Sequence, residues 1–326
     1  MLLHPAPESA LFLGLGTGST IVTSAVHPGL DATGVEQDPE ILPALEYFGP
    51  SVDAIRATGR FRILSSDARR FVRVDTGRYD VVVGEVFHPS RDGSASLYTV
   101  EHFDAIRDRL EDDGLYCQWL PLFQLDIDTL RTIVRSFIHV FPDAEAHLAH
   151  LSLGQPIIAL VGRRDAHRYP RGWLRGRVRS RELAEDLVSV GLENDFALFG
   201  GFLAGGKALA EFAGAGPLNR DDRPVVAYQA SGFVYAQPEP AWVRLLELIE
   251  QVDADASAHF VDAEGGGGFA ARLEDYWRAR DLYLSAGVGV APGDDVRTML
   301  AQLRDPLLSI TAVSSDFIPA YRPLVE

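Results

Sequence analysis

Three glycines alternate at the start of the chain in a spacing that suits binding of a nucleoside. Gly14, Gly16 and Gly18 flank Leu15 and Thr17, directly after a short apolar run. In a loop between a strand and a helix, glycine lets the backbone approach a ligand, and the first N–H groups of the helix point toward it. Taken alone, such a loop is also typical of a tight turn between a strand and a helix.

The acid Glu36 strengthens the nucleoside interpretation. It ends the next predicted strand, eighteen residues after Gly18, where a carboxylate can accept both ribose hydroxyl hydrogens. The dinucleotide pattern G-x-G-x-x-G would require glycine where this chain has Ser19. The loop also lacks a phosphate-binding lysine. The pattern therefore favours a ligand of the S-adenosylmethionine type over NAD.

A second acid, Asp67, follows the third predicted strand. A side-chain acceptor there can take the adenine amino group, although aspartate in this place is also a common helix N-cap. One residue can fill both roles. We count the neighbours of the two acids, Gln37 and Ala68, among the candidate cofactor-binding residues.

Glu85 and His88 lie just past the fourth predicted strand. The carboxyl ends of strands are where such sheets place ligands and catalytic groups. A partly desolvated Glu85 could deprotonate an amine nucleophile, and a surface acid in a loop is the equal alternative. His88 could orient a substrate, although a lone loop histidine is more often merely exposed. No H-x-x-x-H or similar ligand spacing lies nearby, so we expect no metal.

Strand and helix patterns alternate from residue 10 to about residue 162, which predicts an α/β fold with a doubly wound, mostly parallel sheet of the class I methyltransferase-like Rossmann type. The strands are expected at 10–14, 32–36, 61–64, 79–84 and 115–119, with a final hairpin near 146–151 and 157–161. The helices between them are expected at 19–26, 39–48, 68–74, after Thr99 and at 130–141.

Beyond residue 165 the pattern becomes irregular and then helical, with a glycine run at 265–268 typical of a linker or a mobile loop. We divide the chain into an adenosyl-cofactor-binding domain (1–165), an extension packing on it (166–235) and a helical region that could be a degenerate repeat (236–326). Helices are expected at 180–190, 195–213, 240–252, 270–286, 294–303 and 306–313.

Composition narrows the class of protein. The net charge of −16 argues against nucleic acid, because phosphate binding needs a basic surface. It would suit a cationic substrate such as a polyamine, and acidic surfaces also simply keep proteins soluble. The single cysteine, Cys117, allows neither an internal disulfide nor a thiolate metal cluster. No signal peptide and no long apolar run is visible, so we expect a cytoplasmic protein without a membrane span.

In their order, these features resemble the spermidine synthase family, especially the bacterial spermidine synthase-like proteins that are often fused to membrane segments. The resemblance runs from about Leu3 to Arg223. It rests on the segments HP (4–5), FLGLGTG (12–18), VEQDP (35–39), SDARRF (66–71), YDVVVGE (79–85), ASLYT (95–99), GLYCQWL (114–120) and PLNRDDRP (217–224).

The resemblance implies polyamine biosynthesis by aminopropyl transfer from decarboxylated S-adenosylmethionine, a co-substrate, to an amine such as putrescine, with release of methylthioadenosine. Glu36 then matches the ribose-binding acid and Asp67 the adenine-binding acid. Glu85 falls where the family has an aspartate that activates the attacking amine. Tyr98 and Gln118 would line the acceptor side. The resemblance also allows a homodimer.

The chain departs from the family at three points. Thr17 stands where the family has an aspartate that holds the amino group of the cofactor, and His88 replaces a second aspartate of the catalytic loop. The family's N-terminal β-hairpin domain has no counterpart in this sequence. Three functions stay open: an aminopropyltransferase-like enzyme, an S-adenosylmethionine-dependent methyltransferase, and a non-catalytic nucleoside-binding or assembly module. Thr17 is compatible with the second, because the methionine carboxylate disfavours a nearby acid.

Overall fold

The structure is a computed structural model that describes residues 1–45, 55, 57–91, 93–178, 180–236, 239–261, 268–290 and 296–325. The predicted end of the second helix at residue 48 and residues 265–267 of the glycine run lie outside these ranges. No helix within them is long and apolar enough to cross a lipid bilayer.

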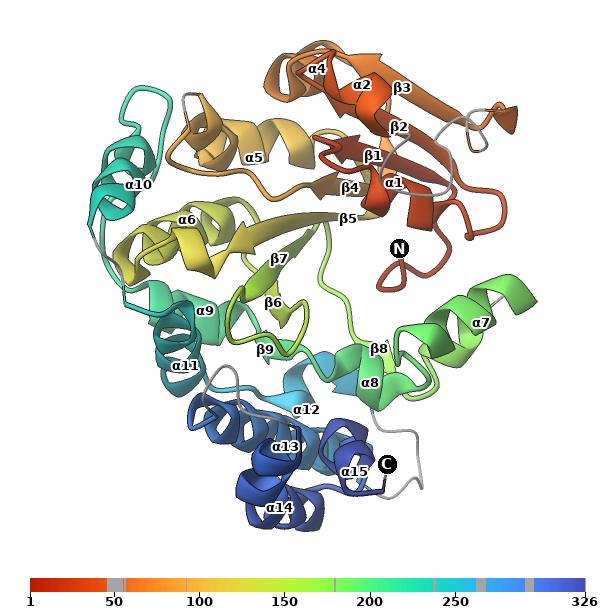
Figure 1. Cartoon of the computed structure of the whole chain (residues 1–326). Coiled ribbons are helices and arrows are strands. Elements are labelled where there is room, and N and C mark those ends of the chain that lie inside the picture. Colours follow the sequence, from red (N-terminus) through yellow and green to blue (C-terminus); the bar gives the residue numbers. More distant parts are fainter. Residues whose placement is uncertain are drawn as a thin grey trace.

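Eight strands form one twisted sheet that runs through the molecule (Figure 1). Their bounds are β1 (Ser9–Leu13), β2 (Asp31–Glu36), β3 (Phe61–Ser65), β4 (Tyr79–Gly84), β5 (Leu110–Pro121), β6 (Glu145–Leu148), β7 (Ile157–Arg163) and β9 (Phe202–Ala204). The order is β3-β2-β1-β4-β5-β7-β6-β9. The neighbours from β3 to β5 pair in parallel, and β7 is antiparallel to both β5 and β6. This confirms the predicted doubly wound, mostly parallel sheet.

Helices follow the strands of the first half in alternation. They are α1 (Ser19–Ser24), α2 (Ile41–Ala44), α4 (Ala68–Val74), α5 (Val100–Arg107) and α6 (Ile127–Val140), with short 3₁₀ turns η2 (Ser94–Tyr98) and η3 (Leu122–Gln124). The longest, α6, begins where the Asp126 carboxylate accepts the Thr129 N–H (2.7 Å), as N-caps do. It buries Leu130, Ile133 and Phe137 along one face, the face that its 3.6-residue periodicity predicts.

The two faces of the sheet bury different cores, because successive strand residues point to opposite sides. Leu11 and Leu13 pack with α4, α5 and α6, whereas Ala10 and Phe12 face α1. On this second face, α1 covers β1 and β2.

The second half adds small strands and a helical region at the far side of the molecule from β3 (Figure 1). Its elements are β8 (Tyr169–Pro170), η4 (Leu174–Gly176), α7 (Arg181–Ser189), α8 (Asp195–Phe199), α9 (Gly206–Ala213), α10 (Val225–Tyr235), α11 (Ala241–Gln251), α12 (Ala256–His259), β10 (Phe260–Val261), α13 (Phe269–Val288), α14 (Val296–Val313) and α15 (Ile318–Val325). An aromatic core gathers here around Tyr169, Phe199, Phe260 and Trp277. The three-part division of the chain stays a prediction.

The structure corrects the helix predictions at two places in this half. The helix expected at 195–213 is interrupted by Gly200 and Gly201 and by β9, which pairs with β6 at the edge of the sheet. Two glycines weaken a helix, and the unpaired edge of β6 offers hydrogen bonds that an extended segment can take. The helices expected at 294–303 and 306–313 are one helix, α14, with Pro306 inside it. Burial of Leu307 and Ile310 favours its continuation past the proline.

Candidate active site

The carboxyl ends of five parallel strands meet at one edge of the sheet and bring the predicted site residues together. Leu13 at the end of β1 pairs with both Val35 in β2 and Gly84 in β4. From β1 the strand order continues through β2 and β3 on one side and through β4 and β5 on the other. The crevice between β1 and β4 is therefore the switch point where such sheets bind ligands. The glycine loop lies on one side of this crevice and Glu85 on the other.

The glycine loop needs its glycines for conformation as well as for access. Gly14, Gly16 and Gly18 all have positive φ angles (78°, 51° and 76°), which side chains with a Cβ rarely adopt. A Cβ on Gly14 would lie 3.0 Å from the Phe87 ring, whereas one on Gly16 would meet no atom within 4 Å. The backbone at Gly16 therefore faces open space, where a ligand could approach.

Glu36 holds the glycine loop in place. One carboxylate oxygen accepts the N–H of Leu15 (2.9 Å) and the other accepts the N–H of Asp38 (3.0 Å). The side chain is buried. A carboxylate has about four lone-pair positions, so Glu36 can bind two hydroxyl hydrogens while it keeps these two bonds. The sequence predicted only the ribose-binding role of Glu36. Its bond to Leu15 joins the ends of β1 and β2, and sequence spacing does not reveal such a contact.

Asp67 is the N-cap of α4, with its Oδ1 accepting the Arg70 N–H (2.6 Å). The residue is exposed, so its second oxygen stays accessible. Gln37 is also exposed and Ala68 is buried beneath the cap. The arrangement allows both predicted roles of Asp67.

The centre of the loop carries hydroxyl groups rather than a carboxylate. Thr17 is exposed and its hydroxyl bonds that of Ser19 (3.0 Å). Neither group carries a charge, so the loop has no anion with which to bind a ligand ammonium.

Glu85 lies beside the glycine loop, with its N–H donating to the Leu13 carbonyl (3.0 Å). Burial raises the pKa of its carboxyl above the ordinary value, and contacts with the Thr20 hydroxyl and the Val86 N–H lower it only in part. A half-buried carboxyl of raised pKa at a strand end is a candidate general base. The sequence analysis did not predict a role for Thr20, although its hydroxyl lies on the first helical turn after the glycine loop and could have indicated one.

Tyr98 and Gln118 are both fully buried behind the loop that carries Glu85. The Tyr98 hydroxyl donates to the Phe87 carbonyl (2.7 Å). The Gln118 amide donates to the Glu85 carbonyl (3.2 Å), and its oxygen accepts the Tyr116 hydroxyl. In this arrangement both residues position the loop, and their predicted contact with an acceptor stays a prediction.

His88 is half-buried and its Nδ1 bonds the amide oxygen of Gln124 in η3. This contact fixes the ring against the end of β5, on the β4 side of the crevice. Gln124 was not foreseen, because it lies 36 residues away in the sequence.

The segment at 217–224 packs against α4 and η2 beside the site. Asn219 is fully buried, and its side chain donates to the Ala95 carbonyl and accepts the Val226 N–H (both 3.1 Å). Asp221 forms ion pairs with Arg69 and Arg73 of α4. The segment therefore positions α4 and η2, a structural role that the sequence motif did not reveal.

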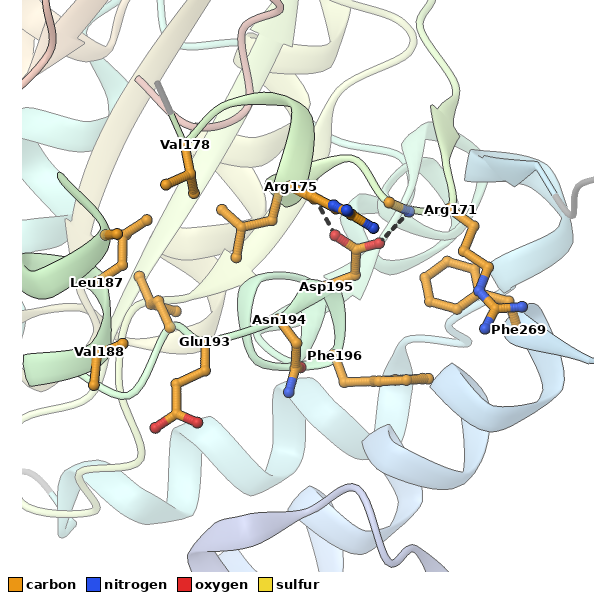
Figure 2. A pocket seen from close by; sticks show the side chains of 14 residues that line it. Arg171, Arg175, Val178, Leu187, Val188, Glu193, Asn194, Asp195, Phe196 and Phe269 are labelled. Carbon is orange, nitrogen blue, oxygen red and sulfur yellow. Dashed lines mark hydrogen bonds between the residues drawn. The ribbon is translucent and has the colours of Figure 1, made fainter. Parts of the chain in front are cut away.

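A separate cavity of about 520 Å³ lies between η4, α7 and α8 (Figure 2). Its carboxylate Asp195 accepts the N–H groups of Gly172 and Leu174. Apolar side chains such as Leu187 and Phe269 make up much of the remaining lining. None of the predicted site residues at the carboxyl edge of the sheet lines this cavity. We place the candidate active site at the carboxyl edge, where these residues lie together. Among the described residues, no group of three His, Cys, Asp or Glu side chains could hold a metal ion.

Comparison with known proteins finds relatives of the first half of the chain. The family model of the spermine/spermidine synthase domain matches residues 1–152. The polyamine aminopropyltransferase of Lachnospira eligens is 27% identical over 154 residues, which cover 46% of this chain and 54% of that protein. The polyamine aminopropyltransferase of Thermotoga maritima is 24% identical over 153 residues, covering 47% and 52%. The chain thus spans about half the length of these relatives.

Solved structures that match this chain include a spermidine synthase in complex with the transition state analogue AdoDATO (TM-score 0.49, 16% identity, 76% of this chain and 71% of that chain). Another is human methyltransferase-like protein 13 in complex with SAH (TM-score 0.41, 18% identity, 57% and 81%). The matched segment contains the glycine loop, Glu36, Asp67 and Glu85. Through residues 1–152, somewhat less than half of its length, the chain is similar to the spermine/spermidine synthase domain.

Proposed function

We propose that the chain binds decarboxylated S-adenosylmethionine at the glycine loop and transfers its aminopropyl group to an amine. The observation that carries the proposal is Glu85, a carboxyl of raised pKa that lies beside the loop at the switch point of the sheet. Glu36 would bind the ribose hydroxyls, and Asp67 would bind the adenine amino group. The polyamine aminopropyltransferases among the relatives support this class of reaction.

The reaction would be a direct displacement at the carbon beside the sulfonium. The neutral amine attacks this carbon in line, the carbon–nitrogen bond forms, and the carbon–sulfur bond breaks to release methylthioadenosine. The ammonium proton of the product passes to Glu85. Alignment of amine and sulfonium can supply much of the acceleration, and removal of the proton supplies a further factor.

The environment of Glu85 suits the role of base. A carboxylate of ordinary pKa is a weak base near neutral pH, and a base works best when its pKa approaches the working pH. Burial against α1 raises the pKa of Glu85 in that direction. His88, which Gln124 holds in place, is the proposed contact for the acceptor, with Tyr98 and Gln118 behind it.

A second candidate is methyl transfer from intact S-adenosylmethionine, and Thr17 favours it. The loop presents the Thr17 and Ser19 hydroxyls, which do not repel a methionine carboxylate as an aspartate would. The same crevice and the same base would then serve a different alkyl group.

One assay separates these functions. The protein is incubated with decarboxylated S-adenosylmethionine and a panel of diamines and polyamines, and methylthioadenosine is measured by chromatography. We expect product from the parent protein and a rate about 100-fold lower in Glu85→Gln, since a general base contributes about that much. The matched control is Glu111→Gln, an exposed glutamate in β5 at the opposite edge.

The other outcomes reject the proposal in different ways. Accumulation of S-adenosylhomocysteine from the intact cofactor would establish the methyltransferase. Calorimetric binding of adenosyl ligands without any product would support the non-catalytic module. Equal rates in the parent and Glu85→Gln would remove Glu85 from the mechanism.

A further inference from the structure

A large cavity lies on the second face of the sheet. Of the residues described at the carboxyl edge, Thr20 of α1 also belongs to its lining. Its volume is about 1030 Å³, at the upper end of the range of about 300–1,000 Å³ for small-molecule sites. Its floor consists of apolar side chains from four neighbouring strands, which all point to this face. They are Phe12, Val81, Val83, Leu115, Trp119, Ala159 and Val161.

The walls come from three parts of the chain that are distant in sequence. Residues 1–3 and α1 form one side, α7 contributes Leu183 and Leu187, and α13 contributes Tyr276 and Arg280. Figure 1 shows α7 and the N-terminus on the same side of the sheet. The cavity therefore lies between the sheet, the N-terminal residues and the second half of the chain, and its lining is mainly apolar.

His147 provides the first polar group in this lining. It is only 8% exposed, and its Nε2 donates to the buried Glu145 carboxylate (3.0 Å). Glu145 also accepts the Tyr169 hydroxyl (3.0 Å), so its position is fixed from both sides. Within the described residues, Nδ1 of His147 has no hydrogen-bond partner. That nitrogen accepts from an O–H when the ring is neutral and donates when the ring is charged.

Arg280 provides a positive charge in the same lining. It is 2% exposed. Its Nε forms an ion pair with Asp281 (2.8 Å), and its Nη1 donates to the carbonyls of Gly200 (2.9 Å) and Phe202. Within the described part of the chain, Nη2 has no partner. An arginine that is buried with unused donors calls for an acceptor.

The segment 200–202 joins these two groups. The Gly201 carbonyl accepts the Leu148 N–H (2.6 Å) beside His147, and the Gly200 carbonyl binds Arg280. Tyr276 packs on Gly200 so closely that a Cβ there would lie 2.3 Å from its ring. Burial raises the pKa of Tyr276 to about 12, so its hydroxyl remains a donor at neutral pH. His147, Arg280 and Tyr276 thus form one polar end of an apolar cavity.

We propose that this cavity binds a carboxylic acid with a long apolar body, such as a fatty acid. The guanidinium of Arg280 and the hydroxyl of Tyr276 bind the carboxylate, and His147 bonds its second oxygen. The apolar body lies along the strand residues of the floor. Asp186, the acid in the lining, is exposed on α7, on a different wall from Arg280.

The net charge of the chain does not attract an anionic ligand, so binding of a carboxylate would depend on a positive charge inside the cavity. At −16, the protein as a whole repels anions. Preference for an acid over a neutral analogue must then come from a specific cation, and Arg280 is the buried guanidinium in this lining.

Calorimetric titration of the full chain with three probes of equal length tests the proposal. The probes are dodecanoate, dodecan-1-ol and dodecylammonium, each kept below its micellar concentration. We expect dodecanoate to bind with one-to-one stoichiometry, and the alcohol and the amine at least about tenfold more weakly, because a charge-assisted bond to Arg280 is lost. Binding that is equal for acid and alcohol, or no saturable binding, would overturn the proposal.

Two variants, one on the wall and one on the floor of the cavity, locate the site. Arg280→Gln should weaken dodecanoate about tenfold or more. Ala159→Phe, which places a ring on the floor, should abolish binding of all three probes. Arg107→Gln, an exposed arginine at the end of α5, is the matched control and should leave binding unchanged. If Arg280→Gln shows no cooperative thermal transition, Ala159→Phe and the head-group series decide. Unchanged binding in a folded Ala159→Phe variant would contradict the assignment.

Discussion

Glu36 fixes the glycine loop and is also the proposed ligand of the ribose. Its carboxylate fixes the glycine loop through Leu15 and the turn after β2 through Asp38. The remaining lone pairs point to the same strand end, where a ribose would lie. Loss of the charge should therefore affect both the loop and the ligand.

The first prediction concerns Glu36→Gln. The new amide nitrogen would face a backbone N–H at Leu15 or Asp38, so one donor loses its acceptor. We expect the free energy of unfolding to fall by about 1–3 kcal/mol and the affinity for methylthioadenosine to fall about tenfold or more. Urea denaturation and calorimetry measure the two effects. Glu40→Gln, which changes an exposed acid in the turn after β2, should change neither. Unaltered stability would show that the loop does not depend on this carboxylate.

The second prediction concerns the pH dependence of transfer. Glu85 acts as a base only when ionised, and burial raises the pKa of its carboxyl. The rate should therefore rise with pH, with an acid limb at a higher pH than the ordinary glutamate value of about 4.3. The profile of kcat/KM between pH 4 and pH 9 measures this limb. A profile that is flat above pH 5 would argue against Glu85 as the base.

At the scale of elements, the strongest sequence patterns were the most informative. β4 was predicted at its observed bounds, because its β-branched apolar residues are buried on both faces. The buried face of α6 followed from its periodicity. The strand ends then brought Gly14, Glu36 and Glu85 to one edge, as parallel pairing requires.

Other features depend on contacts that no local pattern contains. β9 forms only because β6 presents an unpaired edge to it. The fixed positions of Tyr98 and Gln118 depend on how β4 and β5 align. The partners of His88 and Asp221 lie 36 and 152 residues away. Such long-range pairs decide what a polar side chain does, and sequence spacing does not reveal them.

The third prediction tests whether the segment at 217–224 stabilises the fold through the hydrogen bonds of Asn219. Asn219→Ala leaves the Ala95 carbonyl and the Val226 N–H buried without their partners. We expect the free energy of unfolding to fall by about 2–4 kcal/mol. Asn194→Ala, which removes an N-cap from α8, should cost about 1 kcal/mol. Chemical denaturation of both variants compares them. If Asn219→Ala lowers the free energy of unfolding no more than Asn194→Ala does, the segment does not have this stabilising role.

At the scale of the whole molecule, Glu145 connects the sheet to the helical region. From β6 it bonds His147 (3.0 Å) and Tyr169 (3.0 Å) and pairs with His259 of α12 (3.5 Å). Arg163 in β7 completes the cluster through the Tyr169 hydroxyl (2.6 Å). These residues come from four elements, so the cluster holds the two halves of the chain together.

The fourth prediction follows from the protonation of Glu145. Burial alone would raise its pKa, but hydrogen bonds from His147 and His259 and the charge of Arg163 hold the pKa of this carboxyl well below its usual range. A lowered pKa in the folded state contributes stability above the unfolded value of about 4.3, and this contribution is lost as the pH falls below it.

Glu145→Gln should therefore be less stable than the parent by about 1–3 kcal/mol at pH 7, and the difference should shrink below about pH 4. Urea denaturation at a series of pH values measures it, with Glu111→Gln as the exposed control for loss of one negative charge. A stability difference that does not change with pH would mean that ionised Glu145 does not stabilise the fold.

The central claim is that the carboxyl edge of the sheet binds an adenosyl ligand without a phosphate. Calorimetric titration of the whole chain with methylthioadenosine, and separately with NAD, tests it directly. We predict one-to-one binding of methylthioadenosine and no binding of NAD, because the glycine loop has Ser19 where a dinucleotide site needs glycine. Absence of binding by methylthioadenosine, or tighter binding of NAD, would contradict the claim.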